Sequence, residues 1–157
     1  KYYCHFTSPI RRYPDLCIHR IIKDSICGRA DEQKLKKYKA DSQVTAEIAS
    51  LTERKAQSLE REVAKMKKAQ YMQQYIGESF EGVISGVTNF GIYVQLPNTV
   101  EGMVRLDSLR DDYYDYEPGK YRVIGRLSHN IYALGDRVTI EVLAANPEER
   151  QIDFLIV

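Results

Sequence analysis

The sequence predicts an α+β protein in two parts, a helical part over residues 1–76 and a small antiparallel β-barrel over residues 77–157. Two observations predict this division. Apolar residues recur mostly at helical spacing before residue 76 and alternate with other residues after it. The net charge also changes sign there, from +7 over residues 1–76 to −6 over residues 77–157. We therefore expect the first part to attract polyanions, and the second to bind nucleic acid only through a local groove and stacking surfaces.

The first part is expected to contain a helix from about residue 14 to residue 27, after which Gly28 supplies a stop. Residues 29–39 are polar and rich in lysine, so they are interpreted as a solvated connection or a short helix. Ser50 and Glu53 have the spacing of a capping box and open a long helix that lasts until Gly77. Helices with one apolar stripe each bury only a modest core. The apolar positions expected to pack are Leu16, Ile18, Ile21, Ile22 and Ile26 in the first helix and Leu59, Val63, Met66 and Tyr71 in the long one.

The second part consists of short alternating runs. Residues 79–85, 90–96 and 100–104 predict a three-stranded meander with turns at residues 86–89 and 97–98. Residues 121–127 and 130–134 predict a further hairpin, and residues 138–143 and 151–157 predict closing strands. Short antiparallel strands at this density are typical of a small closed barrel. We therefore expect an OB-type five-stranded β-barrel with an extra hairpin.

Composition narrows the class of protein. The 157 residues are 43% hydrophobic and 29% charged, as in ordinary soluble proteins. No apolar run approaches the ~20 residues that cross a bilayer, and no basic-then-apolar leader opens the chain. The three cysteines, Cys4, Cys17 and Cys27, lack Cys-x-x-Cys spacing, so neither a disulfide framework nor a zinc site is expected. These features predict a cytoplasmic protein with no membrane partner.

Two adjacent arginines follow a Ser-Pro turn near the start of the chain, in the run HFTSPIRRYPDL at residues 5–16. Guanidinium groups match phosphate oxygens two at a time and keep their charge, so Arg11 and Arg12 on a constrained turn suggest a phosphate clamp. The alternative is that Ser8 and Pro9 begin a helix and that both arginines are solvated. The residue types alone leave both interpretations open.

The run at residues 5–16, together with His19 and Arg20, resembles the last motif of the ribonuclease II and ribonuclease R exoribonuclease family. In that family the first arginine after Ser-Pro-Ile lies at the catalytic centre, so the resemblance implies a catalytic role for Arg11. Arg12, Ser8 and Tyr13 are expected to support the phosphate or the turn. His5 and His19 are expected to be hydrogen-bonded packing residues.

The resemblance also implies a metal that this sequence does not bind. The family's catalytic domain carries aspartates upstream of this motif that hold magnesium at the scissile phosphate, and no such cluster precedes the motif here. We therefore expect the chain to be the C-terminal end of a larger magnesium-dependent enzyme, with no metal site and no activity of its own. Its apolar helix faces would then lack the rest of the catalytic domain, and a second copy of the chain could cover them.

Four phrases in residues 77–157 resemble the S-one RNA-binding family, named after a ribosomal protein; they lie at residues 77–84, 89–94, 100–104 and 134–138. Phe90 and Tyr93 flank a glycine on one strand, where a bulge or strong twist would let unpaired bases stack on both rings. Arg105 and Arg150 could hold phosphates beside them. Phe80 is assigned to the barrel core. This sequence has Arg105 where the family often has histidine, and Asn146 where aspartate is common.

These features together predict the C-terminal part of a hydrolytic 3′-to-5′ exoribonuclease that degrades RNA to nucleoside monophosphates, with a barrel that binds single-stranded RNA. The alternative is a free-standing RNA-binding module with a helical dimerisation arm. The tyrosine-rich insert at residues 111–130 resembles the extended loop and hairpin of the ribonuclease R members of the family. Whether it contacts RNA or packs against the catalytic domain stays open.

Overall fold

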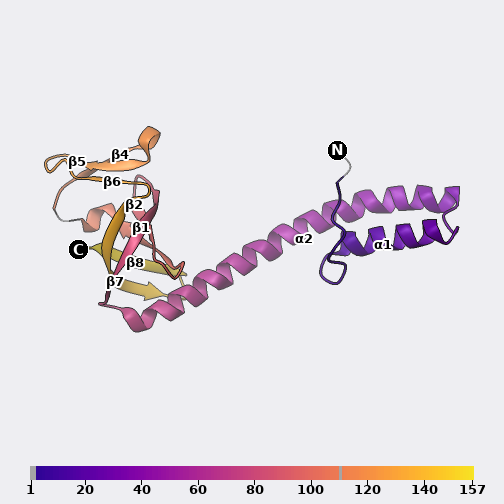
Figure 1. Cartoon of the computed structure of the whole chain (residues 1–157), viewed down its shortest axis with the longest axis horizontal. Helices are drawn as coiled ribbons and strands as arrows, with labels where there is room; N and C mark the ends of the chain where they lie inside the picture. The colour runs from indigo at the N-terminus through magenta and orange to yellow at the C-terminus, as the bar shows by residue number, and fades with distance from the viewer. Residues whose placement is uncertain (1–2, 110) are drawn as a thin grey trace. The chain divides into compact units, whose positions relative to one another are not determined.

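The structure, a computed structural model, describes residues 3–109 and 111–157. The chain forms two compact units, the first ending at Glu60 and the second beginning at Arg61 (Figure 1). The division falls inside a helix, whereas the change of hydrophobic period in the sequence falls near residue 77. Over the described ranges, no helix combines the length and hydropathy required to cross a membrane.

The first unit holds helix α1, Tyr13–Ile26, and the beginning of helix α2, Glu32–Met72. Pro14 lies in the first turn of α1, where its fixed φ suits the helix. The helix ends at Cys27, and Gly28 follows with φ of +67°. The amide of Gly28 donates to the Ser25 carbonyl at 3.2 Å and that of Arg29 to Asp24 at 2.8 Å, the two bonds of a Schellman motif. The predicted stop at Gly28 is therefore confirmed.

Helix α2 begins earlier than the sequence indicated. It runs without a break from Glu32, so residues 32–39 are helical and not a solvated connection. The capping box at Ser50 was the wrong signal, because Ser50 lies in the helix interior and its hydroxyl donates to the Ala46 carbonyl at 2.7 Å. The N-terminal cap is Asp31, whose side chain accepts from the Lys34 amide at 2.7 Å. No glycine or proline separates residue 32 from residue 50, so nothing stops the helix from extending.

The first unit has almost no interior. Among its described residues only Asp15 is buried. Polar contacts join its two helices instead: the Tyr38 hydroxyl donates to Asp24, and Lys34 forms an ion pair with the same carboxylate at 2.6 Å. In the long helix, Leu59, Val63 and Tyr71 of the predicted apolar stripe are 65%, 45% and 47% exposed, and Met66 is partly buried.

The second unit contains a closed barrel (Figure 1). Its strands are β1 (Ser79–Val87), β2 (Gly91–Gln95), β3 (Glu101–Arg105), β7 (Arg137–Asn146) and β8 (Gln151–Ile156), in the order β1-β2-β3-β8-β7 around the barrel. This confirms the predicted five-stranded barrel, with one correction: β3 pairs with β8 in parallel. Five strands cannot alternate in direction all the way around a closed ring, so at least one neighbouring pair must be parallel.

The barrel interior forms the hydrophobic core of the described chain. Inward-facing positions of every strand are buried, among them Ile84, Val94, Val104, Ile140 and Phe154. Ala69 and Met72 from the last turns of α2 join the same core. As predicted, Phe80 packs against this core, and its ring meets the ring of Tyr75 edge-on at 5.8 Å.

A second, three-stranded sheet interrupts the barrel sequence, with β4 (Tyr114–Glu117), β5 (Arg122–Gly125) and β6 (Ile131–Ala133) in that order. The hairpin predicted over residues 121–134 is β5 and β6, and β4 extends it. Arg126 joins β4 to this hairpin through a bidentate pair with Asp115 at 2.7 and 2.8 Å. Short 3-10 turns complete the described elements at Gln73–Tyr75, Leu106–Ser108 and Pro118–Lys120.

Candidate phosphate site and nucleic-acid interface

The Ser-Pro segment forms a turn ahead of α1 and does not begin that helix. The amides of Arg11 and Arg12 both donate to the Ser8 carbonyl, at 3.3 and 3.0 Å. Helix α1 starts only at Tyr13. The helix-start interpretation of Ser8 and Pro9 is therefore wrong, and both arginines belong to a closed turn.

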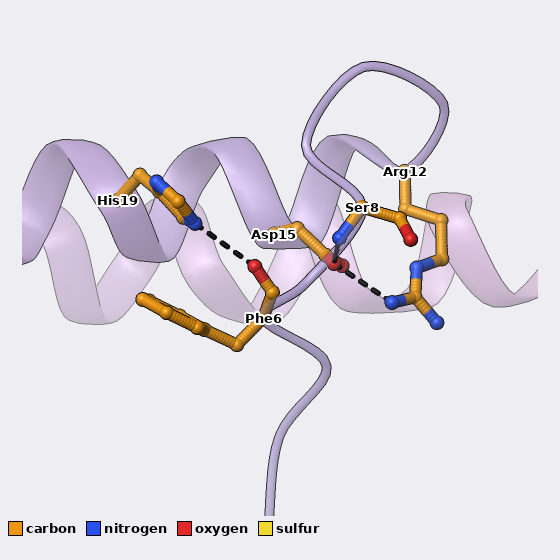
Figure 2. A network of polar contacts seen from close by, with 5 residues as sticks. All are labelled: Phe6, Ser8, Arg12, Asp15 and His19. Atoms are coloured by element: carbon orange, nitrogen blue, oxygen red, sulfur yellow. Dashed lines mark hydrogen bonds and ion pairs between the residues drawn. The ribbon is translucent and has the colours of Figure 1, made fainter.

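A buried carboxylate holds this turn. Asp15 is 0% exposed, and its Oδ2 accepts from the Ser8 amide at 2.7 Å and from the Arg12 guanidinium at 2.9 Å (Figure 2). Burial acts to raise the pKa of Asp15, but the Ser8 amide and the Arg12 side chain together outweigh it, so this pKa lies below its ordinary value. Asp15 was not among the site residues predicted from the sequence. The available signal was an acidic residue in the first turn of a helix, three positions after an arginine.

The two adjacent arginines have different surroundings. The Arg12 side chain is only 18% exposed and is engaged by Asp15. Arg11 is exposed, and it forms no ion pair within the described ranges. It borders a groove of about 610 Å³ between residues 11–14 and the part of α2 from Thr45 to Glu60. This arrangement leaves the guanidinium group of Arg11 available to a phosphate, whereas Arg12 supports the turn.

Aromatic and histidine side chains pack next to the turn. His19 shares a hydrogen bond of 2.9 Å with the Phe6 carbonyl, and the rings of Phe6 and His19 stack at 4.4 Å (Figure 2). His19 therefore has the hydrogen-bonded packing position that was predicted. The His5 ring meets Tyr3 edge-on at 5.9 Å, and Tyr13 is exposed at the rim of the groove.

The residues around this turn do not fit a magnesium ion. Throughout the described ranges, no three His, Cys, Asp or Glu side chains gather as metal ligands would. Asp15, the carboxylate within the turn, already accepts hydrogen bonds from Ser8 and Arg12. The turn therefore offers a cation to phosphate and offers no ligand set to magnesium.

On the barrel, Phe90 and Tyr93 lie together as predicted. Their ring centroids are 6.5 Å apart and the rings are nearly perpendicular, at 87°. Phe90 is 56% exposed and Tyr93 is partly exposed. The register shift lies on the neighbouring strand β1, between Ile84 and Gly86, and not between Phe90 and Tyr93 where a bulge or twist was expected; Gly86 then pairs with Tyr93. The two rings form a small aromatic surface open to solvent.

Arg105 and Arg150 both carry carboxylate partners. Arg105 Nε lies 3.9 Å from Asp153, and an Arg150 terminal nitrogen lies 2.8 Å from Glu62. Both arginines are about half exposed or more, and exposed pairs of this kind contribute about 0–1 kcal/mol, so a phosphate can compete for either cation. Asn146 accepts hydrogen bonds from the amides of Glu148 and Glu149 at 3.0 and 3.3 Å, a turn contact that an aspartate would also make.

A closed five-stranded barrel that presents an aromatic pair, with Arg150 lining the same groove as Tyr93, is typical of an OB-type nucleic-acid-binding domain. Residues 73–156, more than half of the chain, match the S1 RNA binding domain family. The chain belongs to this family. Residues 1–28, which contain the Arg11 turn, match the RNB domain family.

Relatives that match over nearly the whole chain are ribonucleases. Ribonuclease R 1 of Lactococcus lactis is 42% identical over 97% of this chain and 19% of its own length. Ribonuclease R of Vibrio parahaemolyticus is 45% identical over 100% of this chain and 20% of its own length. The chain thus spans about a fifth of the length of these curated relatives. The resemblance to the ribonuclease R family noted in the sequence is confirmed.

Solved structures give the same result. The apo form of RNase R from Mycoplasma genitalium matches 99% of this chain and 24% of its own, with a TM-score of 0.90 and 28% identity. The same enzyme in complex with ribose methylated single-stranded RNA matches 99% of this chain and 24% of its own, with a TM-score of 0.91 and 28% identity.

Proposed function

We propose that this chain supplies a phosphate-contacting turn and an RNA-binding barrel to a hydrolytic exoribonuclease of the ribonuclease R type. One observation carries the proposal: the chain joins an RNB match and an S1 match, and relatives aligned across both are ribonuclease R. A free-standing RNA-binding module with a helical dimerisation arm gives no reason for the RNB-type turn at residues 5–16.

In this proposal Arg11 acts on the phosphate under attack. Negative charge on the non-bridging oxygens increases as a nucleophile adds, so a guanidinium already in position stabilises the transition state more than the bound substrate. The Asp15 contacts to Ser8 and Arg12 hold the turn closed, which fixes the backbone that carries Arg11. Asp15 and Arg12 are thus positioning residues, and Arg11 is the catalytic residue.

Magnesium belongs to the same proposal, as a cofactor of the full-length enzyme. Held by ligands of its own, it would supply the activation of water and the stabilisation of the leaving oxygen. Because the described residues provide no ligand set for it, we place its ligands on a segment outside this chain. The 3′-to-5′ direction and the release of nucleoside monophosphates complete the proposed activity.

The barrel has the second role, which is to hold single-stranded RNA. Bases stack on Phe90 and Tyr93, and Arg105 and Arg150 exchange their carboxylate partners for phosphates. Stacking on an aromatic face depends little on base identity, so the barrel should bind many sequences. The M. genitalium enzyme, whose structure with single-stranded RNA matches this chain, supports this assignment.

The experiment compares the 157-residue chain with the full-length enzyme on a labelled single-stranded RNA in magnesium buffer. The chain alone should bind the RNA and release no nucleotides, whereas the full-length enzyme should release nucleoside monophosphates. Hydrolysis by the chain alone would refute the placement of the metal ligands outside it. Failure of the full-length enzyme to degrade RNA would refute the proposed activity.

A further inference from the structure

A second groove lies within the second unit, between the last turns of α2 and the barrel strands. Its volume is about 440 Å³. Arg61, Lys65 and Lys68 line it from the helix, at positions i, i+4 and i+7, so they share one helical face. The structure thus places three cations of one helical face along a groove.

The opposite wall of the groove comes from the barrel. Tyr93 of β2 and Met103 of β3 are direct cross-strand partners and both line it. One of the two aromatic rings proposed to stack bases therefore faces the same groove as the helical cations. A tyrosine ring and a methionine opposite a basic wall suit a single nucleic acid strand, whose bases and phosphates lie on different sides.

The charges along the groove differ in their availability. Arg61 and Lys65 are exposed, and neither forms an ion pair within the described ranges. Lys68 donates to the Thr99 carbonyl, which ties α2 to the loop between β2 and β3. Two acidic residues of the barrel also line the groove: Glu101 accepts from the Ser85 hydroxyl and keeps its charge, and Asp153 lies 3.9 Å from Arg105. The fourth cation of the groove, Arg150, is paired with Glu62 at 2.8 Å. Free positive charge is thus concentrated on the helix wall.

We propose that Arg61 and Lys65 bind RNA phosphates, so that the RNA site extends from the barrel onto helix α2. The strand lies in the groove with a base against Tyr93 and Met103 and its phosphates toward Arg61 and Lys65. This inference rests on the proposed RNA binding by the barrel. It adds a phosphate-binding wall from an element outside the barrel strands.

A general electrostatic role is the competing explanation, because any cation on α2 offsets the acidic barrel. The two explanations differ for Lys67, which lies on the same helix but does not line the groove and donates to Gln70 at 3.0 Å. Lys55 is likewise exposed on α2 and outside the groove. The variant Lys55→Gln/Lys67→Gln therefore removes the same charge as Arg61→Gln/Lys65→Gln without touching the groove.

The test measures fluorescence anisotropy of a labelled 12-nucleotide oligouridine with the 157-residue chain at several salt concentrations. Each phosphate contact to a single strand contributes about 0.7 to the slope of log affinity against log salt. Arg61→Gln/Lys65→Gln should therefore lower the slope by about 1.4 and weaken binding about 25-fold at 0.1 M salt. The control pair should leave the slope unchanged, and circular dichroism should show the same helix content in all variants.

Equal salt slopes for the two double variants would refute phosphate binding by Arg61 and Lys65, whether both slopes fall or neither does. A further variant separates this failure from that of the proposed function. If Phe90→Ala/Tyr93→Ala abolishes binding while Arg61→Gln/Lys65→Gln does not change it, the barrel binds RNA and the helix wall is refuted. If the unmodified chain does not bind the oligouridine, both the barrel assignment and this inference are refuted.

Discussion

Replacing the aromatic pair of the barrel by alanine gives a quantitative test of RNA binding. Stacking of a base on an aromatic side chain contributes about 1–3 kcal/mol. Since about 1.4 kcal/mol corresponds to a tenfold change in affinity, Phe90→Ala should weaken binding of single-stranded RNA by about 5- to 140-fold. Tyr93→Ala should have an effect in the same range. The double variant should lose less than the product of the two, because the rings contact each other at 6.5 Å and share neighbouring bases.

The structure also predicts that this loss does not come from unfolding. Phe90 is 56% exposed and lies outside the core cluster, and surface substitutions of this kind change stability by about 0.5 kcal/mol or less. Leu143→Ala is the matched control, because Leu143 is 54% exposed on barrel strand β7 and lines no part of either groove. Anisotropy titrations of labelled oligouridine and a thermal midpoint for each variant complete the assay. Unchanged affinity in Phe90→Ala and Tyr93→Ala, with intact folds, would refute the stacking surface.

Three further predictions concern the turn, the small sheet and the helices. Asp15→Ala should release the Ser8 amide and the Arg12 side chain, so hydrogen exchange at the Ser8 amide should accelerate. The control variant Lys23→Ala should leave this exchange rate unchanged. Equal exchange rates in the two variants would mean that Asp15 does not hold the turn. The pKa of Asp112 is lowered to about 2 from 3.8, and the hydrogen bond from the Ser128 amide is the main cause. The contribution of this carboxylate to the free energy of unfolding is therefore fully present above about pH 4 and is lost as the pH falls toward 2. Amide protection in β4–β6, which is the exchange rate relative to the intrinsic rate at each pH, should fall across that window. Asp112→Asn should show no such fall, and the same protection profile in both proteins would contradict the assignment. The exposed apolar side chains of residues 14–75 predict concentration-dependent self-association of the chain in light scattering, and a monomer at all concentrations with intact helices would contradict it.

The barrel could be predicted closely because its signals are local. Alternation places one face of each strand inside, and residues 88–90 and 96–100 separate the first three strands, so the turn predicted at residues 86–89 began two residues too early. The parallel pairing of β3 with β8 is not local, since it follows from closure of a ring with an odd number of strands. Strand β4 was missed because its side chains show weak alternation and its position depends on pairing with β5 and on the Arg126 contact to Asp115.

In the helical part, a local sequence pattern predicted the wrong start of a helix. A capping box at Ser50 is a correct local pattern, yet the chain before it already continues as helix from the Asp31 cap. A local pattern cannot tell a helix start from an exposed helix interior when no glycine or proline intervenes.

The candidate sites divide in the same way. Arg11, Phe90 and Tyr93 could be singled out because each lies in a recognisable run of sequence. Asp15 could not be assigned a partner, because its contact with Ser8 spans seven residues and forms only when the turn closes. Arg61 and Lys65 look like any solvated helical face until β2 and β3 are placed opposite them. Chemistry that depends on a single segment is visible in sequence, and chemistry that depends on two segments is not.

The most direct test of the proposed function is the effect of Arg11→Ala on the full-length enzyme, with single-turnover hydrolysis and RNA affinity measured separately. The hydrolysis rate should fall by about 10²- to 10³-fold, as for the loss of one transition-state donor, while affinity changes little. Arg11→Lys should recover only part of the rate, because lysine keeps the positive charge but lacks the paired donors of the guanidinium group. The control variant Lys23→Ala, at an exposed cation of α1, should hydrolyse RNA at the rate of the unmodified enzyme. Equal losses of rate and affinity would make Arg11 a binding residue and contradict its assignment to the catalytic centre.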